Sequence, residues 1–283
     1  MSFRASSFCF LCTGLIAFAA HAQSETPTPA AAQAPSLITV NISLTTNYKF
    51  RGQDQDALGN NGFYKTSAVK PAVQGGFDYA HESGFYVGNW NSSVNWLAGN
   101  SIESDIYGGY KFKAGPFDLD FGVLTYIYPG NRTGNTTELY GAATWSDEAI
   151  GAFTVKYSST VSKDYFGFAS NRTTGWKGRG TGYLNIAYSK EIFPKVTLKA
   201  AVGYTALSSD IRRNTPYKSY VDYNVGATYD FGGGLSLTGA IVGANKKDAY
   251  QATTGQLVLP AGTFTTSESP NKARFIATLT KTF

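Results

Sequence analysis

The chain has 283 residues, of which 42% are hydrophobic, 15% aromatic and 15% charged, and its formal net charge is +5. The modest positive charge is dispersed and forms no basic cluster, so we expect no nucleic-acid partner. The only cysteines, Cys9 and Cys12, lie near the N-terminus, which excludes disulfides, thiolate metal sites and a cysteine nucleophile from the rest of the chain.

The N-terminus has the pattern of a secretory signal peptide. Arg4 precedes an apolar run from Phe8 to Ala20, and Ala20-His21-Ala22 has the form of a cleavage site. The run is too short to cross a bilayer as a helix. We therefore expect residues 1–22 to be removed on export. Residues 23–36, rich in proline and alanine, are predicted to form a flexible periplasmic leader.

From residue 37 onwards, apolar and polar residues alternate. In Ile38-Thr39-Val40-Asn41-Ile42-Ser43-Leu44-Thr45 every even residue is apolar, which places the two sets on opposite faces of a strand. About twelve such segments have the length that a tilted strand needs to cross an outer membrane. The predicted strands span residues 38–50, 72–80, 84–96, 102–112, 117–128, 137–147, 152–162, 182–192, 196–207, 219–231, 235–245 and 273–283.

The lengths of the connections support a membrane barrel. Every second connection is a tight turn, as at residues 81–83, 113–116, 147–151, 193–195 and 232–234. Several of the others are long, namely 51–71, 163–181, 208–218 and 246–272. Short periplasmic turns that alternate with longer external loops are typical of outer-membrane barrels. Residues 37–283 are thus predicted to form an all-β fold, a transmembrane antiparallel up-and-down β-barrel of about twelve strands.

The last predicted strand ends on Phe283, with Phe275 and Leu279 on the same face. An aromatic residue that closes an amphipathic strand resembles the signal that the barrel assembly machinery reads. We therefore expect this machinery and outer-membrane lipid to be partners of the protein, as an integral protein of the bacterial outer membrane.

The apolar face is predicted to meet lipid, with aromatic residues at both water interfaces. At the outer rim we expect Tyr48, Phe50, Trp96, Tyr204, Tyr223 and Phe275, and at the periplasmic rim Tyr86, Phe112, Phe117, Trp145, Phe153, Phe231 and Phe283.

The other face carries the charges and is predicted to line the lumen. Its bases are Lys49, Arg51, Lys111, Lys156 and Lys199, and its acids are Asp78, Glu103, Asp105, Asp118, Asp120, Glu138, Glu191, Asp222 and Asp230. These residues either line a narrow channel and shape its ion preference, or form salt bridges that pin a closed barrel. Small neutral residues leave space between them and favour the channel, among them Ser43, Thr45, Asn91, Ser93, Gly109, Ser158, Thr205 and Asn224.

Several motifs resemble one known family. They are Thr46-Asn47-Tyr48-Lys49-Phe50-Arg51-Gly52, Gly88-Asn89-Trp90-Asn91-Ser92-Ser93-Val94, Glu103-Ser104-Asp105-Ile106-Tyr107-Gly108-Gly109-Tyr110 and Leu124 to Gly130 followed by Glu138 and Leu139. Together they resemble the TorF family of porins, also described as the Gcw_chp family. The resemblance covers nearly the whole mature chain and implies an outer-membrane barrel that forms a channel. It supplies no site residues.

The expected function is therefore passive diffusion of small hydrophilic solutes, without a cofactor. One alternative is a closed structural or adhesion-type barrel. A second is an outer-membrane hydrolase, which would need a histidine base beside its nucleophile. Of the two histidines, His21 lies in the predicted signal peptide and His81 in a predicted periplasmic turn, so an enzyme is not expected. One histidine without cysteine also disfavours a transition-metal site.

Overall fold

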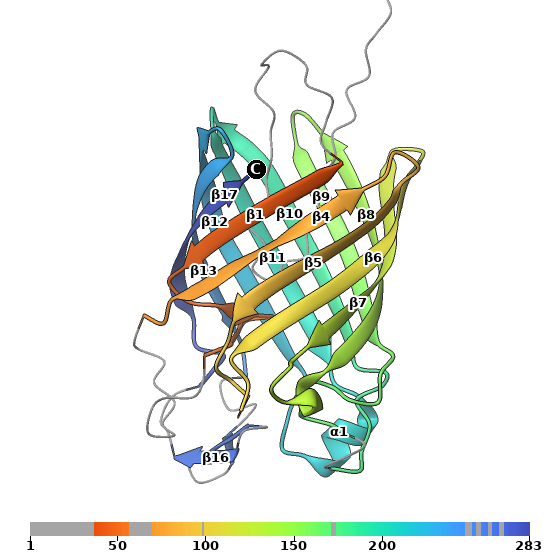
Figure 1. The fold of residues 1–283 in the computed structure, drawn as a ribbon, viewed down its shortest axis with the longest axis vertical. Helices are drawn as coiled ribbons and strands as arrows, with labels where there is room; N and C mark the ends of the chain where they lie inside the picture. The colour runs from red at the N-terminus through yellow and green to blue at the C-terminus, as the bar shows by residue number, and fades with distance from the viewer. Residues whose placement is uncertain are drawn as a thin grey trace, which may run out of the picture.

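The structure is a computed structural model that describes residues 37–56, 69–97, 99–170, 174–246, 251–252, 256–259, 262–265 and 269–283. Within these ranges, twelve strands close into one antiparallel barrel, which confirms the predicted fold (Figure 1). They are β1 (Ile38–Thr45), β4 (Ala72–Ala80), β5 (Phe85–Ser93), β6 (Ile102–Ala114), β7 (Phe117–Ile127), β8 (Thr136–Asp147), β9 (Gly151–Thr160), β10 (Gly182–Phe193), β11 (Val196–Ala206), β12 (Tyr220–Gly232), β13 (Leu235–Ala244) and β17 (Arg274–Thr282).

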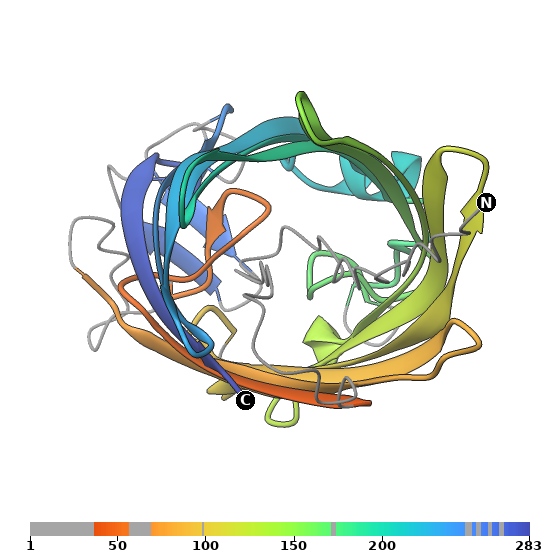
Figure 2. The same cartoon turned by 90° about the horizontal axis from the view of Figure 1, so that it is seen from above.

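The barrel closes because β1 pairs with β4 on one side and with β17 on the other. Every other barrel strand pairs with its neighbours along the barrel, so the wall has no free edge. Closure satisfies the backbone amides of the wall within the wall itself, as a strand that crosses hydrocarbon requires. Figure 2, a view from above, shows the closed ring.

The remaining elements are short and lie in the connections. They are β2 (Lys49–Phe50), β3 (Gln53–Asp54), the 3-10 helix η1 (Arg132–Gly134), α1 (Ser209–Asn214), β14 (Gln251–Ala252), β15 (Gln256–Leu259) and β16 (Gly262–Thr265). None of the helices in the described ranges is long and apolar enough to cross a membrane.

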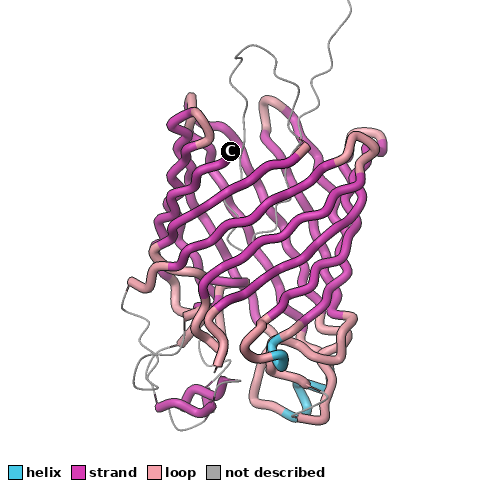
Figure 3. Tube along the Cα trace, in the orientation of Figure 1, coloured by secondary structure: helices cyan, strands magenta, loops and turns pink. Residues whose placement is uncertain are grey.

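The two ends of the barrel differ as the connection lengths predicted (Figure 3). The turn end consists of the tight turns at residues 81–84, 115–116, 148–150, 194–195 and 233–234, together with Phe283. The loop end consists of the described parts of the connections at residues 46–71, 94–101, 128–135, 161–181, 207–219 and 245–273. At the turn end, Gly233 (φ 61°) and Gly234 (φ 76°) adopt the left-handed backbone that a two-residue hairpin turn requires.

Burial in the wall is the inverse of burial in a water-soluble protein. Leu44, Phe121 and Ile241 point outward and are more than half exposed. Glu138 and Thr45 point inward and are 2% exposed each. An apolar outer face around a polar interior is the arrangement of a barrel that has lipid outside and a polar lumen inside.

Aromatic side chains form contacts along the outer face near the turn end. Phe85 packs on Tyr110, which stacks on Phe112, which in turn stacks on Phe121. Farther round the barrel the chain of contacts runs over Trp145, Phe153 and Tyr188, and over Tyr229 and Phe231. The predicted rim aromatics Phe112, Phe117, Phe153, Phe231, Phe283, Tyr204, Tyr223 and Phe275 are all exposed on the outside.

The prediction for residues 38–50 was wrong in part. The first strand ends at Thr45, whose hydroxyl donates to the carbonyl of Asn47 and so helps to turn the chain out of the wall. Tyr48 and Phe50 are therefore not lipid-facing rim residues, since they are 2% and 8% exposed inside the barrel. The other predicted strand boundaries lie within one or two residues of the observed ones, except for β5, which ends at Ser93.

The face assignment of β5 was also wrong. Tyr86 and Trp90 point inward and are 9% and 3% exposed, and the predicted rim residue Trp96 is likewise buried. Asn91 and Ser93 therefore face outward rather than into the lumen. On this outer face, the side-chain amide of Asn91 donates a hydrogen bond to the carbonyl of Gly75 on β4. Both faces of β5 carry an aromatic and a polar residue, so its alternation did not distinguish them.

Candidate functional site

The lumen is filled at the loop end and accessible at the turn end. Inward-facing side chains at the loop end are almost fully buried, as Glu103 (1% exposed), Glu138 (2%) and Thr205 (0%) are. Nearer the turn end, the inward-facing Asp120 and Lys199 are partly exposed. The interior thus consists of a solvent-accessible half and a half that the folded connections close.

The connections of the loop end pack together as one buried cluster, which we call the loop-end core. Its aromatic members make edge-on and tilted ring contacts, for example between Phe50, Tyr126 and Phe166. The loop-end core comprises Tyr48, Phe50, Ala72, Trp90, Val94, Trp96, Leu97, Tyr126, Tyr128, Tyr165, Phe166, Ala169, Leu207, Ile211 and Tyr217. Side chains from five connections and from the wall strands β4, β5 and β7 therefore meet inside the mouth.

A short hairpin, β2–β3, crosses the interior of the barrel. It is the orange ribbon inside the ring of strands in Figure 2. Arg51 (φ 46°) and Gly52 (φ 76°) form its tight turn, in the left-handed backbone of a type I′ turn. A Cβ on Gly52 would lie 2.6 Å from the carbonyl oxygen of Gly243 and 2.8 Å from Cβ of Asp222. Only glycine allows the hairpin tip to contact the far wall at β12 and β13 this closely.

A buried ion pair holds the hairpin to the wall. Nη1 and Nη2 of Arg51 donate to the two carboxylate oxygens of Glu138 at 3.0 and 2.6 Å. The two side chains are 5% and 2% exposed. The guanidinium also lies 4.1 Å from the ring centre of Tyr183. Bidentate pairs of arginine with a carboxylate are among the strong hydrogen bonds in proteins.

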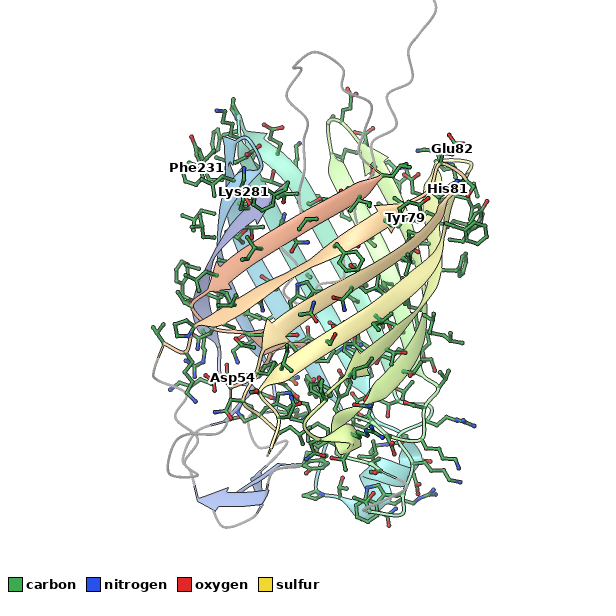
Figure 4. The ribbon with its side chains drawn as sticks, viewed as in Figure 1. Asp54, Tyr79, His81, Glu82, Phe231 and Lys281 are labelled. Carbon is green, nitrogen blue, oxygen red and sulfur yellow. The ribbon has the colours of Figure 1, made fainter. Side chains whose placement is uncertain are left out.

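A second set of ion pairs fixes the base of the hairpin. Lys49 Nζ lies 3.1 Å from Asp54 and donates to the carbonyls of Gly52 and Pro270 at 3.1 and 2.7 Å. Arg274 on β17 lies 3.1 Å from the same Asp54 carboxylate. Figure 4 labels Asp54 near the loop end of the wall. Lys49 and Arg274 therefore both pair with the buried carboxylate of Asp54.

Glu103 accepts its hydrogen bonds from tyrosines of the loop-end core. The hydroxyls of Tyr48 and Tyr128 donate to its two oxygens at 2.7 and 2.5 Å. Burial, and next the negative charges of Glu103 and Asp105, raise the pKa of Tyr48 and Tyr128 well above the usual range. Both phenols therefore stay protonated as donors. Glu103 and Asp105 are buried and do not line an open mouth.

Three further carboxylates of the wall accept from a tyrosine two strands away. Tyr107 donates to Asp78 at 2.5 Å, Tyr86 to Asp120 at 2.6 Å and Tyr183 to Asp222 at 3.0 Å. Each ring crosses a glycine of the strand between, at Gly88, Gly109 and Gly203, where a Cβ would collide with the ring. The glycines of the wall thus leave the space in which the tyrosines reach the acids.

The predicted lumen residues fall into three groups. Lys49 and Arg51 are in the hairpin, and Glu103, Asp105 and Glu138 are buried beside the loop-end core. Asp78, Lys111, Asp120, Lys156, Lys199 and Asp222 lie on the inner wall. The last three, Asp118, Glu191 and Asp230, lie at the turn end, where they bond Lys113, the amide of Lys195 and the amide of Gly232.

Sequence reasoning missed Asp54, Arg274 and the tyrosine donors. Arg274 could have been found, because it alternates with the outward-facing Phe275 in the last strand. Nothing local marks Asp54 as an inward residue.

A cavity of about 70 Å³ lies between the hairpin and the wall of β10 to β13 and β17. Lys49, Arg51, Lys199 and Asp222 supply its charged lining. A second cavity of about 30 Å³ lies among the aromatic side chains of the loop-end core.

His81 lies in a turn at the opposite end of the barrel from Asp54 (Figure 4). Its Nδ1 is 2.7 Å from the hydroxyl of Ser83, and the pair is exposed. Among the described residues, no group of three or more His, Cys, Asp or Glu side chains is arranged to hold a metal ion.

Residues 29–283 match the family described as "Bacterial protein of unknown function (Gcw_chp)", and the chain belongs to this family. Among solved structures, the chain is similar to the KdgM porin, with a TM-score of 0.52 and 9% identity over 87% of this chain and 99% of that one. For the KdgM porin in complex with disordered oligogalacturonate, the TM-score is 0.51 with the same identity and coverage.

The NanC porin in a rhombohedral crystal form gives a TM-score of 0.52 at 10% identity, over 87% of this chain and 98% of that chain. A comparison with curated proteins found no match. At these identities the likeness establishes the fold, a closed antiparallel barrel of the outer-membrane porin kind.

Proposed function

We propose that this member of the Gcw_chp family is an outer-membrane channel through which small hydrophilic solutes diffuse passively. The observation that carries the proposal is the inverted burial of the wall: an apolar, aromatic-rimmed exterior surrounds a lumen with Lys111, Asp120, Lys156 and Lys199 on its inner face. Charged side chains in the lumen of a barrel of this size are either solvated by water or paired with one another. Lys199 is partly exposed and has no ion pair within the described ranges, which favours solvation.

The hairpin is proposed to set the narrowest point of the channel. β2 and β3 pair only with each other, so the wall is complete without them. The ion pairs of Arg51 and Lys49 hold the hairpin across the lumen. A solute would pass on the side where the cavity of about 70 Å³ lies, between the hairpin and β10 to β13. The loops 51–71 and 246–272, which we propose to narrow the mouth, lie partly outside the described residues.

A sealed barrel is the second candidate, because the loop-end core fills the mouth with buried aromatic side chains. Conductance in a planar lipid bilayer distinguishes the two. The full chain, purified from outer membranes, should give discrete current steps if it is a channel. Folded, heat-modifiable protein without any current would defeat the channel and favour the sealed barrel.

The predicted signal peptide (1–22) and leader (23–36) lie outside the described residues, and export by this route is part of the proposal. Assembly is proposed to use β17, which closes the barrel against β1 and is followed by the exposed Phe283. Fractionation and N-terminal sequencing test the first point. The rate of barrel assembly after deletion of Phe283 tests the second.

A further inference from the structure

We infer that the cavity between the hairpin and the wall is a binding site for the carboxylate group of small hydroxylated organic acids, held by Lys199. Such acids would be the solute class of the proposed channel. Their transport rests on the proposed function. Binding itself does not depend on conductance.

The charge of the cavity favours an anion. Its lining contains three basic side chains, Lys49, Arg51 and Lys199, and one acid, Asp222. Lys49 Nζ is committed to Asp54 and to two carbonyls, and the guanidinium of Arg51 to Glu138. Asp54 and Glu138 neutralise these two cations, so Lys199 is the basic side chain of the lining that remains available to an anion. A partly desolvated positive site lowers the energy of an incoming anion.

Lys199 is the cation with free donors. It lies on β11 opposite Ser189 of β10 and Gly226 of β12, so small residues surround it on both sides. Within the described ranges, no carboxylate lies in ion-pair distance of its ammonium group. Lys156 on β9 also lacks an ion pair, but its ammonium lies 4.0 Å from the ring centre of Tyr140 and is stabilised there. Lys199 is thus the side chain that an anion in the cavity would meet.

Two further polar groups of the lining have unused capacity. The side-chain amide of Asn224 has no hydrogen-bond partner among the described residues, and it can donate to a carboxylate oxygen. Asp222 accepts from Tyr183 with Oδ1, whereas its buried Oδ2 has no partner. A buried acceptor without a donor costs free energy. A hydroxyl group of the solute would satisfy it, which is why we infer a hydroxy acid rather than a simple carboxylate.

The size of the cavity limits what enters it. A volume of about 70 Å³ corresponds to roughly five water-sized positions, enough for a carboxylate group and the next carbon. Ala240, Val242 and Ile276 provide an apolar side for that carbon. Lys199 lies three residues from the turn-end limit of β11 at Val196. The rest of the solute would therefore extend into the accessible turn-end half of the lumen.

The test measures binding of gluconate to the full chain in detergent by titration calorimetry, with glucose as the neutral counterpart. Three variants are compared with the unmodified protein: Lys199→Gln, Lys199→Arg and Lys281→Gln. Lys281 is the matched control, since it carries the same charge on the outer face near the turn end (Figure 4). Heat modifiability verifies that each variant is folded. Bilayer conductance is recorded for each in parallel.

We expect gluconate to bind and glucose not to. Lys199→Gln should weaken gluconate binding about tenfold or more, since it removes a charge-assisted hydrogen bond. Lys199→Arg should retain most of the affinity, and Lys281→Gln should leave it unchanged. Equal gluconate affinity of Lys199→Gln and the unmodified protein, or no gluconate binding at all, overturns the site even if the barrel conducts. Binding with the expected variant pattern in a barrel without current supports the site and overturns the channel.

Discussion

Replacement of Glu138 by glutamine should release the β2–β3 hairpin from the wall. In the structure, both oxygens of Glu138 accept from Arg51, at 3.0 and 2.6 Å, and the two side chains are 2% and 5% exposed. Removal of one partner leaves a buried charge without compensation, which costs about 3–5 kcal/mol. The contact of Arg51 with the ring of Tyr183 is present in both proteins and does not change this difference.

A loss of about 3 kcal/mol, the lower end of this range, changes the ratio of docked to undocked hairpin more than 100-fold. The assay is single-channel recording in planar bilayers, where Glu138→Gln should show larger or more frequent current steps than the unmodified protein. Trypsin added to intact cells gives an independent readout, because an undocked hairpin exposes Lys49 and Arg51 from the loop end. Cleavage in this hairpin should accelerate in the variant.

Two controls separate release of the hairpin from general damage. Asp118→Asn removes an acid that pairs with Lys113 at 3.0 Å, with side-chain exposures of 36% and 70%. An exposed pair contributes at most about 1 kcal/mol, so currents should not change. Arg51→Met combined with Glu138→Leu removes both buried charges and should restore docking in large part. If folded Glu138→Gln protein shows unchanged currents and unchanged cleavage, the ion pair does not hold the hairpin and the reasoning is refuted.

Three other predictions concern the wall and the turn end. Val225→Arg on the lipid face should lower the unfolding free energy by about 2–4 kcal/mol, whereas Asn224→Arg, one residue away and facing the cavity, should still fold; equal loss in urea titrations would mean that the faces are misassigned. Gly122→Val should lower stability by about 1–3 kcal/mol, because a Cβ there would lie 2.6 Å from Cζ of Tyr140; a thermal midpoint equal to that of the unmodified protein would show that the ring moves freely. His81→Ala should leave currents unchanged, and a lipid-hydrolysing activity that disappears with this substitution would revive the hydrolase alternative.

The amino-acid sequence by itself determined the wall of this protein. In a strand that separates lipid from a polar lumen, apolar and polar side chains must alternate at every residue. The positions and faces of most strands can therefore be predicted from neighbouring residues in the sequence. Phe153 and Phe231 were placed outside, and Asp120 and Lys199 inside, from this rule alone. The alternation of turn and loop lengths placed the two ends in the same way, because connection length is also a local property.

Tertiary structure alone decided what fills the mouth. The alternation continues through Tyr48 and Phe50, yet the chain leaves the wall at Thr45, because the hairpin gains partners far away in the sequence. Arg51 meets Glu138 across 87 positions, and Arg274 meets Asp54 across 220. Tyr86 turns inward for the same reason, since its hydroxyl reaches Asp120 over Gly109 of the intervening strand. Such partners depend on closure of the barrel, which no stretch of neighbouring residues encodes.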